Sequence, residues 1–124
     1  MKKAYYFSFL LFTILLVNCK PQHRTVKVLV PADFKEAIKN PDVQLIDVRT
    51  YVEFNEGHIE GAKNIDYLAE DFEAQMNKFD KDKPIFIYCA SGGRSEVTAS
   101  MLYELGFKDI NDLSGGFIAW KKMQ

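Results

Sequence analysis

Cysteine and long apolar runs are scarce in this sequence, and neither sign of charge is in large excess. It holds only 2 Cys among 124 residues, which excludes a scaffold held together by several disulfides. Its 16 Lys and Arg nearly balance its 17 Asp and Glu and form no cluster, so a strong electrostatic footprint for nucleic acid or an anionic membrane is excluded. No internal repeat or low-complexity tract occurs. The composition, 48% hydrophobic and 27% charged, is typical of one folded domain.

The N-terminal segment differs in composition from the rest of the chain. A short basic start, Met1–Lys3, precedes an uncharged and largely apolar run from Ala4 to Val17. As a helix this run measures about 21 Å, which is less than the roughly 30 Å core of a bilayer. A basic segment followed by a short apolar one is typical of an export signal, and we expect residues 1–18 to be one.

The end of that run resembles a bacterial lipobox, in which a leucine lies three positions before a cysteine that is lipidated. Its sequence is Leu15-Leu16-Val17-Asn18-Cys19, and Asn18 replaces the usual Gly, Ala or Ser. The resemblance implies a lipid on Cys19, a location in the cell envelope or periplasm, and contact with the membrane through that lipid only. An uncleaved N-terminal anchor, or secretion with Cys19 free, are the alternatives.

Short apolar segments alternate with amphipathic ones in the remainder of the chain. We expect residues 19–24 to form a polar tether and residues 25–124 to form one domain. Strands are predicted at residues 25–30, 43–48, 64–65, 84–88 and 110–113, and helices at residues 31–40, 51–55, 72–79, 94–105 and from residue 115 onwards. This alternation favours an α/β fold with a mainly parallel sheet and helices on both faces.

The loop after the most apolar strand carries the candidate chemistry. It begins at Cys89 and reaches Arg94, and ligands of parallel α/β sheets bind at such strand ends. Four small residues separate the two: Ala90, Ser91, Gly92 and Gly93. Their N–H groups can turn inward and form an anion-binding nest, which lowers the pKa of a thiol and makes Cys89 a candidate nucleophile. The alternative is a small buried cysteine at a strand end, followed by a turn without catalytic role.

Four motifs, in this order, resemble the rhodanese-like family of sulfurtransferases. They are Leu45–Arg49, Glu53–Phe54 with Gly57–Ile65, Cys89–Arg94, and Gly115–Phe117 with Ala119–Trp120. The resemblance covers nearly all of the chain beyond the tether. It implies a five-stranded, mainly parallel sheet flanked by helices, in a single-domain member of the family.

The resemblance also implies a reaction, with Cys89 in the sulfur-carrying position. The Cys89 thiolate would attack the outer sulfur of thiosulfate or a similar donor, release sulfite and hold a persulfide, which a thiol or cyanide would then accept. Backbone N–H groups from Ala90 to Ser95 would stabilise the persulfide, and Arg94 would bind the donor's sulfonate or balance the charge of the loop. The expected partners are therefore small molecules, with no metal or organic cofactor, and we expect a monomer.

Several polar residues near these motifs are expected to have structural roles. His58 lies in a stretch that forms a structural turn in the family, and Glu53 is interpreted as structural too. Asp47 and Arg49 are expected to form an ion pair, and Ser95 to cap the helix after the loop. Two His and one available Cys show no metal-ligand spacing, so no metal site is predicted.

Functions of other classes stay open. A cysteine phosphatase or arsenate reductase typically has five residues between its Cys and Arg, whereas this loop has four between Cys89 and Arg94. A non-enzymatic binding module of the same family usually lacks the cysteine. A thiol–disulfide protein is disfavoured because no Cys-x-x-Cys pair is present.

Overall fold

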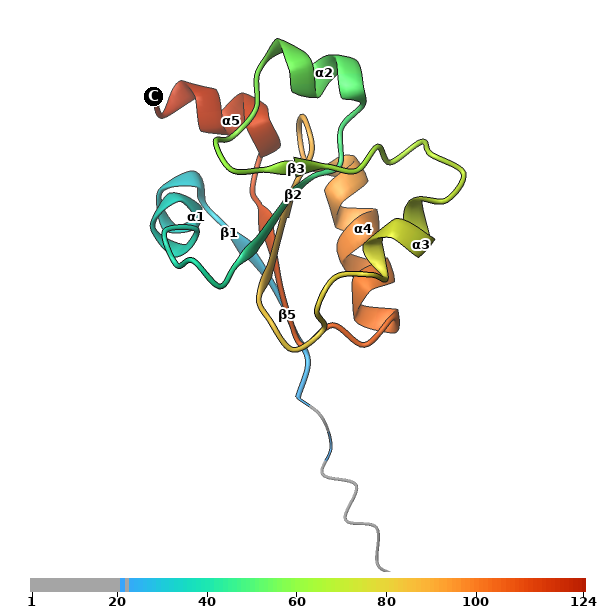
Figure 1. Cartoon of the computed structure of the whole chain (residues 1–124). Helices are drawn as coiled ribbons and strands as arrows, with labels where there is room; N and C mark the ends of the chain where they lie inside the picture. The colour runs from blue at the N-terminus through green and yellow to red at the C-terminus, as the bar shows by residue number, and fades with distance from the viewer. Residues whose placement is uncertain (1–20, 22) are drawn as a thin grey trace, which may run out of the picture.

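Five strands form one sheet in the order β1-β5-β4-β2-β3 (Figure 1). The computed structural model describes residues 21 and 23–124. The strands are β1 (Thr25–Leu29), β2 (Gln44–Asp47), β3 (Lys63–Asn64), β4 (Ile85–Tyr88) and β5 (Asp109–Leu113). The helices are α1 (Pro31–Ala37), α2 (Tyr51–Glu56), α3 (Phe72–Met76), α4 (Gly93–Glu104) and α5 (Gly116–Lys122). Every strand pairing is parallel, so the predicted α/β fold with a five-stranded sheet is confirmed.

The predictions for the N-terminus fall outside this region. The export signal at residues 1–18, the lipidation of Cys19 and part of the tether concern residues that the structure does not describe. Within the described residues, no helix combines the length and the apolar character that crossing a membrane requires. The described chain enters β1 at the amino edge of the sheet, opposite the edge at which the strands end (Figure 1).

Two apolar clusters pack against the two faces of the sheet. Side chains of α3 and α4 belong to one cluster, and those of α1 and α5 belong to the other (Figure 1). Successive residues of β4 alternate between them: Ile85 and Ile87 lie in the first cluster, and Phe86 and Tyr88 in the second. Because both faces are covered, this strand is apolar at every position, and the sequence shows a continuous apolar run there.

Helix ends follow local sequence signals with small differences. Gly106 ends α4 as predicted: its φ is +94°, and the N–H of Phe107 donates to the carbonyl of Leu102 at 3.1 Å. The helix predicted at residues 72–79 ends earlier, at Met76, because the following residues form turn hydrogen bonds such as Phe79 N–H to the Met76 carbonyl. The helix predicted at residues 31–40 likewise ends at Ala37.

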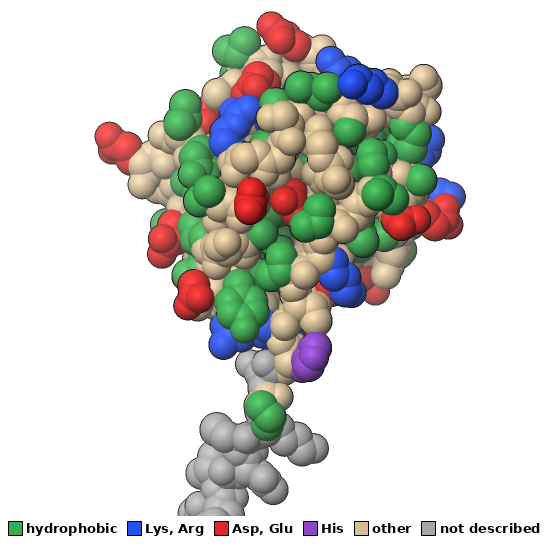
Figure 2. Space-filling view, turned by 180° about the vertical axis from the view of Figure 1, so that it is seen from behind, with side chains coloured by type: hydrophobic (Ala, Val, Ile, Leu, Met, Phe, Trp, Pro, Cys, Tyr) green, Lys and Arg blue, Asp and Glu red, His purple; other side chains and the backbone are tan. Residues whose placement is uncertain are grey.

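The surface has no single chemical character on the side seen in Figure 2. Acidic, basic and apolar side chains are interspersed over that side. This mixture agrees with the near balance of positive and negative residues in the sequence. In parallel α/β sheets, ligands bind at the carboxyl edge of the strands, and the candidate loop lies there.

Candidate active site

Cys89 lies directly after β4, in a loop that curls around its sulfur. The residue is 1% exposed, and the N–H of Gly92 donates to Sγ at 3.0 Å. The thiol in turn donates to Oγ of Ser95 over 3.5 Å. Gly92 has a φ of +118°, a conformation that other residues rarely adopt, and this allows the loop to turn back over the sulfur before α4 begins.

Opposing effects act on the pKa of the Cys89 thiol. Burial alone raises this pKa, because a thiolate loses solvation inside the protein. Once the proton has left, the sulfur can accept hydrogen bonds from the hydroxyl and N–H of Ser95 and from the N–H groups of Gly92 and Ser91, and these bonds lower the pKa. The net result is a lowered pKa, so the loop favours the thiolate, which is the nucleophilic form of cysteine.

The N-terminal end of α5 holds the first part of this loop in place. The carbonyl of Cys89 accepts a hydrogen bond from the N–H of Phe117 at 2.8 Å, and that of Ala90 accepts one from Ile118 at 3.0 Å. Gly116 packs directly against these carbonyls: a Cβ there would lie 2.6 Å from backbone atoms of both loop residues. The sequence predicts a helix here, but the support that it gives to the loop is seen only in the structure.

Arg94 forms an ion pair with Glu53, a contact that the sequence does not predict. Its two terminal nitrogens donate to the two carboxylate oxygens of Glu53, each at 2.9 Å. Glu53 also accepts from the N–H and hydroxyl of Thr50, in the capping box that starts α2. Of the two roles expected for Arg94, the geometry favours charge balance, because both terminal nitrogens already bind a carboxylate. The pair ties α2 to the start of α4.

This ion pair predicts a pH-dependent contribution to stability. The hydrogen bond from Arg94, helped by those from Thr50, lowers the pKa of Glu53 from 4.5 to about 2. A carboxyl whose pKa falls on folding stabilises the fold above its unfolded pKa, and this stability is lost as pH falls through the folded value. We expect Glu53→Gln to lower the free energy of unfolding by about 0.5–1 kcal/mol near neutral pH, since the pair is partly exposed.

The loss should disappear between about pH 4.5 and 2, where Glu53 itself becomes protonated. Urea unfolding at several pH values measures this difference. Glu56→Gln is the matched control, because Glu56 ends the same helix and is exposed. Equal stability of the Glu53→Gln variant and the native protein at neutral pH would contradict the prediction.

Ser95 does not cap α4, so this prediction was wrong. The residue at the start of the helix is Gly92, whose conformation is left-handed and which makes no side-chain cap. Ser95 lies one turn further on and is fully buried. Its hydroxyl donates to the Gly92 carbonyl at 3.2 Å and faces the Cys89 sulfur. The side chain is turned inward, towards the loop, and is not available to the free N–H groups of the helix.

The expected ion pair of Asp47 and Arg49 is confirmed, and the His58 ring packs within the turn after α2. Arg49 donates to the Asp47 carboxylate at 2.7–3.0 Å and to the Gly57 carbonyl at 2.6 Å. His58 is exposed, and its ring stacks on Phe54 with 3.7 Å between the centroids. Its Nδ1 lies 2.9 Å from the Phe54 carbonyl. These contacts hold the turn after α2.

The fold and the loop define an α/β domain with a thiol at its carboxyl edge, surrounded by backbone N–H groups. The sequence profile of the rhodanese-like domain matches residues 30–123, and the chain belongs to this family. It is 37% identical over 99 residues to the uncharacterized protein YqhL of Bacillus subtilis, covering 80% of this chain and 75% of that protein.

Other relatives and solved structures agree with this assignment. The tRNA uridine(34) hydroxylase of Staphylococcus carnosus is 36% identical over 111 residues, covering 82% of this chain and 33% of the hydroxylase. The chain thus spans about a third of that protein's length. The crystal structure of a rhodanese-related protein from Thermoplasma volcanium superposes with a TM-score of 0.69 at 29% identity, covering 78% of this chain and 92% of that one. The crystal structure of a rhodanese-like domain protein from Staphylococcus aureus superposes with a TM-score of 0.67 at 32% identity, covering 76% of this chain and 90% of that one.

Proposed function

We propose that this protein is a sulfurtransferase of the thiosulfate type, which carries a sulfane sulfur on Cys89. The observation that carries the proposal is the environment of the Cys89 sulfur. The N–H of Gly92 points at it from 3.0 Å, and hydrogen bonds lower its pKa in spite of burial. The loop therefore stabilises a negative charge on sulfur, as a thiolate before the reaction and as a persulfide after it.

The proposed reaction has two sulfur transfers. The Cys89 thiolate attacks the outer sulfur of thiosulfate, and a new S–S bond forms while the S–S bond of the donor breaks. The electron pair of the broken bond leaves with sulfite, and the persulfide keeps one negative charge. Cyanide or a thiolate then attacks the outer sulfur of the persulfide, and the Cys89 thiolate is restored. Charge is conserved in both steps, and neither needs a metal or an organic cofactor.

Two neighbours of the sulfur have separate tasks in this proposal. Loop N–H groups hold the persulfide anion in the place of the thiolate. Arg94 balances the negative charge near the loop while it remains paired with Glu53.

We also propose that the protein acts as an exported monomer, anchored by a lipid on Cys19. The basic and apolar segments before Cys19 support export, and the lipobox-like end of the run supports lipidation. The described chain enters β1 at the amino edge of the sheet (Figure 1). Cys89 directly follows β4 and therefore lies at the carboxyl edge. A membrane anchor before β1 would therefore attach to the domain at the edge of the sheet opposite the sulfur-carrying loop.

Intact mass spectrometry of the full-length chain tests the sulfurtransferase. The chain carries Cys19→Ser, so that Cys89 is its only thiol. It is kept in mild detergent because of its apolar N-terminal run. We expect incubation with thiosulfate to add one sulfur atom, and cyanide to remove it with release of thiocyanate. The Cys89→Ser variant should keep its circular dichroism spectrum and gain no sulfur.

Other results would redirect the assignment. No gain of sulfur in the folded, reduced protein from thiosulfate or any other sulfane donor would contradict the proposal and favour a binding module. Rapid hydrolysis of an aryl phosphate that depends on Cys89 would favour a phosphatase. Hydroxylation is not carried over from the tRNA uridine(34) hydroxylases, because the match to the protein from Staphylococcus carnosus covers only 33% of its length.

A further inference from the structure

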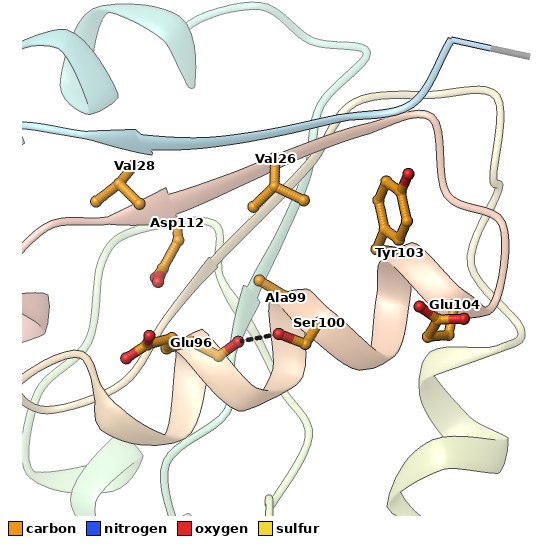
Figure 3. Close-up of a pocket in the computed structure, with 8 residues that line it drawn as sticks. All are labelled: Val26, Val28, Glu96, Ala99, Ser100, Tyr103, Glu104 and Asp112. Atoms are coloured by element: carbon orange, nitrogen blue, oxygen red, sulfur yellow. Dashed lines mark hydrogen bonds between the residues drawn. The ribbon is translucent and has the colours of Figure 1, made fainter.

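The face of β1 that lies towards α4 is an open apolar surface. β1 is an edge strand, with β5 as its neighbour on one side only. Its Val26 and Val28 side chains are 45% and 66% exposed, and both point towards α4 (Figure 3). Together with Ala99 and Tyr103 of α4 they line a cavity of about 400 Å³, which we call the β1–α4 groove.

The backbone of β1 is also open on its outer side. The N–H of Thr25 and the carbonyl of Leu29 form hydrogen bonds with residues that flank β5, at 2.9 and 2.8 Å. In a parallel ladder alternate residues bond to the same neighbour, so the backbone groups of Val26 and Val28 point away from β5. An edge of this kind can pair with a further strand. The groove therefore combines a free strand edge with apolar side chains on one face.

Acidic side chains lie in and around this groove. Of the eight described residues that line it, three are acidic and none is basic: Glu96, Glu104 and Asp112. Asp112 is 5% exposed, and its Oδ1 has no hydrogen-bond partner among the described residues. Its carboxyl points from β5 towards the first turns of α4 (Figure 3). Such a buried and unpartnered oxygen is costly, and a cationic donor is the partner that stabilises it most.

A basic side chain lies at one end of the groove only. The guanidinium of Arg24 lies 4.8 Å from the centre of the Tyr103 ring and donates to the Tyr103 carbonyl at 2.6 Å. Glu96 lies seven residues earlier in α4, about 10 Å away along the helix, and Asp112 faces that end. The ion pairs of the described chain include neither of these acids. This end of the groove therefore has acids without a cation.

The same end of the groove leads to the active-site loop. A second cavity, of about 420 Å³, shares Val28, Glu96 and Asp112 with the groove, and its wall includes Gly92 of the loop. A molecule that lies along β1 would thus end beside the loop that surrounds the Cys89 sulfur.

We propose that the β1–α4 groove binds an extended segment of a partner protein that carries an arginine. The segment adds a strand to the sheet beside β1 and forms backbone hydrogen bonds with Val26 and Val28. Neighbouring strands lie about 4.8 Å apart, so a residue paired with Val28 lies about 10 Å from Asp112, the partner of Val28 in β5. Only a long side chain crosses Val28 to reach that carboxylate, and an arginine supplies the missing donor.

A second copy of this chain fits the groove less well. Two β1 strands can pair only through the outward backbone groups of their valines, which leaves Lys27 on the opposite face, 3.6 Å from Asp109. Arg24 is held by Tyr103. Two copies would therefore bring together three acids each and supply no free basic side chain from β1.

Binding of a short synthetic peptide to the full-length chain tests the proposal. The chain carries Cys19→Ser and is kept in mild detergent near neutral pH. The probe is acetyl-Thr-Val-Thr-Arg-Thr-Val-Thr-amide, which as a strand puts its valines and arginine on one face, and the control peptide has glutamine in place of arginine. We expect the arginine peptide to shift the amide NMR signals of Val26 and Val28. It should bind at least about tenfold more tightly than the glutamine peptide.

Three variants separate the groove from the rest of the surface. Val28→Lys places a positive charge at an exposed site on the groove face and should abolish binding of the arginine peptide. Val52→Lys is the matched control, because Val52 is 65% exposed on α2, and should leave the affinity unchanged. Asp112→Asn removes the buried charge and should weaken binding of the arginine peptide at least about fivefold, with little effect on the glutamine peptide.

Several results would overturn the proposal. Equal affinity for the two peptides would do so, and so would native affinity in Asp112→Asn or in Val28→Lys. A native dimer in analytical ultracentrifugation that Val28→Lys converts to a monomer would assign the groove to a second copy. Peptide binding that appears only after removal of residues 1–18 would assign it to that segment. Cys89→Ser should bind the arginine peptide with native affinity, so failure of sulfur transfer would not affect this test.

Discussion

Gly116→Ala is expected to lower the free energy of unfolding by about 3 kcal/mol and to slow persulfide formation at least about tenfold. Gly116 begins α5 and has a φ of +60°, so any side chain there strains the backbone. The Cβ would also lie 2.6 Å from the carbonyl oxygens of Cys89 and Ala90. Contacts this short do not persist in real structures, and one of the two segments has to move.

The movement would reach the reactive sulfur directly. The loop and α5 are joined by the hydrogen bonds from Phe117 to the Cys89 carbonyl and from Ile118 to the Ala90 carbonyl. The added methyl group pushes against backbone, which cannot yield as the end of a flexible side chain can. Displacement of the Cys89 carbonyl shifts the sulfur away from the Gly92 N–H, and the thiolate loses part of its stabilisation.

Gly61→Ala separates the effect of contact from that of backbone strain. Gly61 has a φ of +84°, and a Cβ there would meet nothing within 4 Å. We expect this control to lose about 1 kcal/mol and to form the persulfide at the native rate. Urea unfolding and the time course of sulfur uptake by mass spectrometry measure both quantities. Similar losses in both variants would show that conformation alone, and not the approach to the loop, requires glycine at position 116.

Local sequence patterns predicted the fold because each helix and strand is indicated by a pattern within a few consecutive residues. The apolar run before Cys89 predicted a strand, and Gly106 predicted the end of α4. Both signals depend only on residues that are close in the chain. The small residues at 90–93 also lie in one stretch, and the loop they form could be predicted from them. The same holds for the pairing of Asp47 with Arg49, two residues apart.

Contacts between distant segments could not be predicted in this way. Glu53 and Arg94 are 41 positions apart, and nothing in either neighbourhood specifies the other. Ser95 is predicted to cap a helix because serine is a frequent capping residue, yet its hydroxyl turns inward to the Cys89 sulfur. The burial of Asp112 could not be predicted either, because β5 also holds Asp109 and Asn111, and the spacing of polar residues in the strand does not single out one of them. These residues acquire their roles only when the sheet brings the strand ends together.

Arg49→Met is expected to be the other severely destabilising substitution, with a loss of about 3–5 kcal/mol in the free energy of unfolding. The Asp47 side chain is fully buried and the Arg49 side chain is 6% exposed. The guanidinium also donates to the Gly57 carbonyl and lies 4.2 Å from the ring centre of Phe117. Methionine fills much of the same volume but leaves the Asp47 charge buried without its cation.

A paired substitution tests this explanation. Asp47→Asn removes the orphaned charge, so the double variant with Arg49→Met should be more stable than Arg49→Met alone. The surface pair of Lys27 and Asp109, with side chains 54% and 36% exposed, supplies the control. Lys27→Met should cost at most about 1 kcal/mol, because solvent screens that pair. The explanation would be contradicted if the double variant were no more stable than Arg49→Met. The lost stability would then come from the packing of Arg49 on Phe117 and from its hydrogen bond to Gly57. In that case the turn after α2 would depend on shape and not on charge.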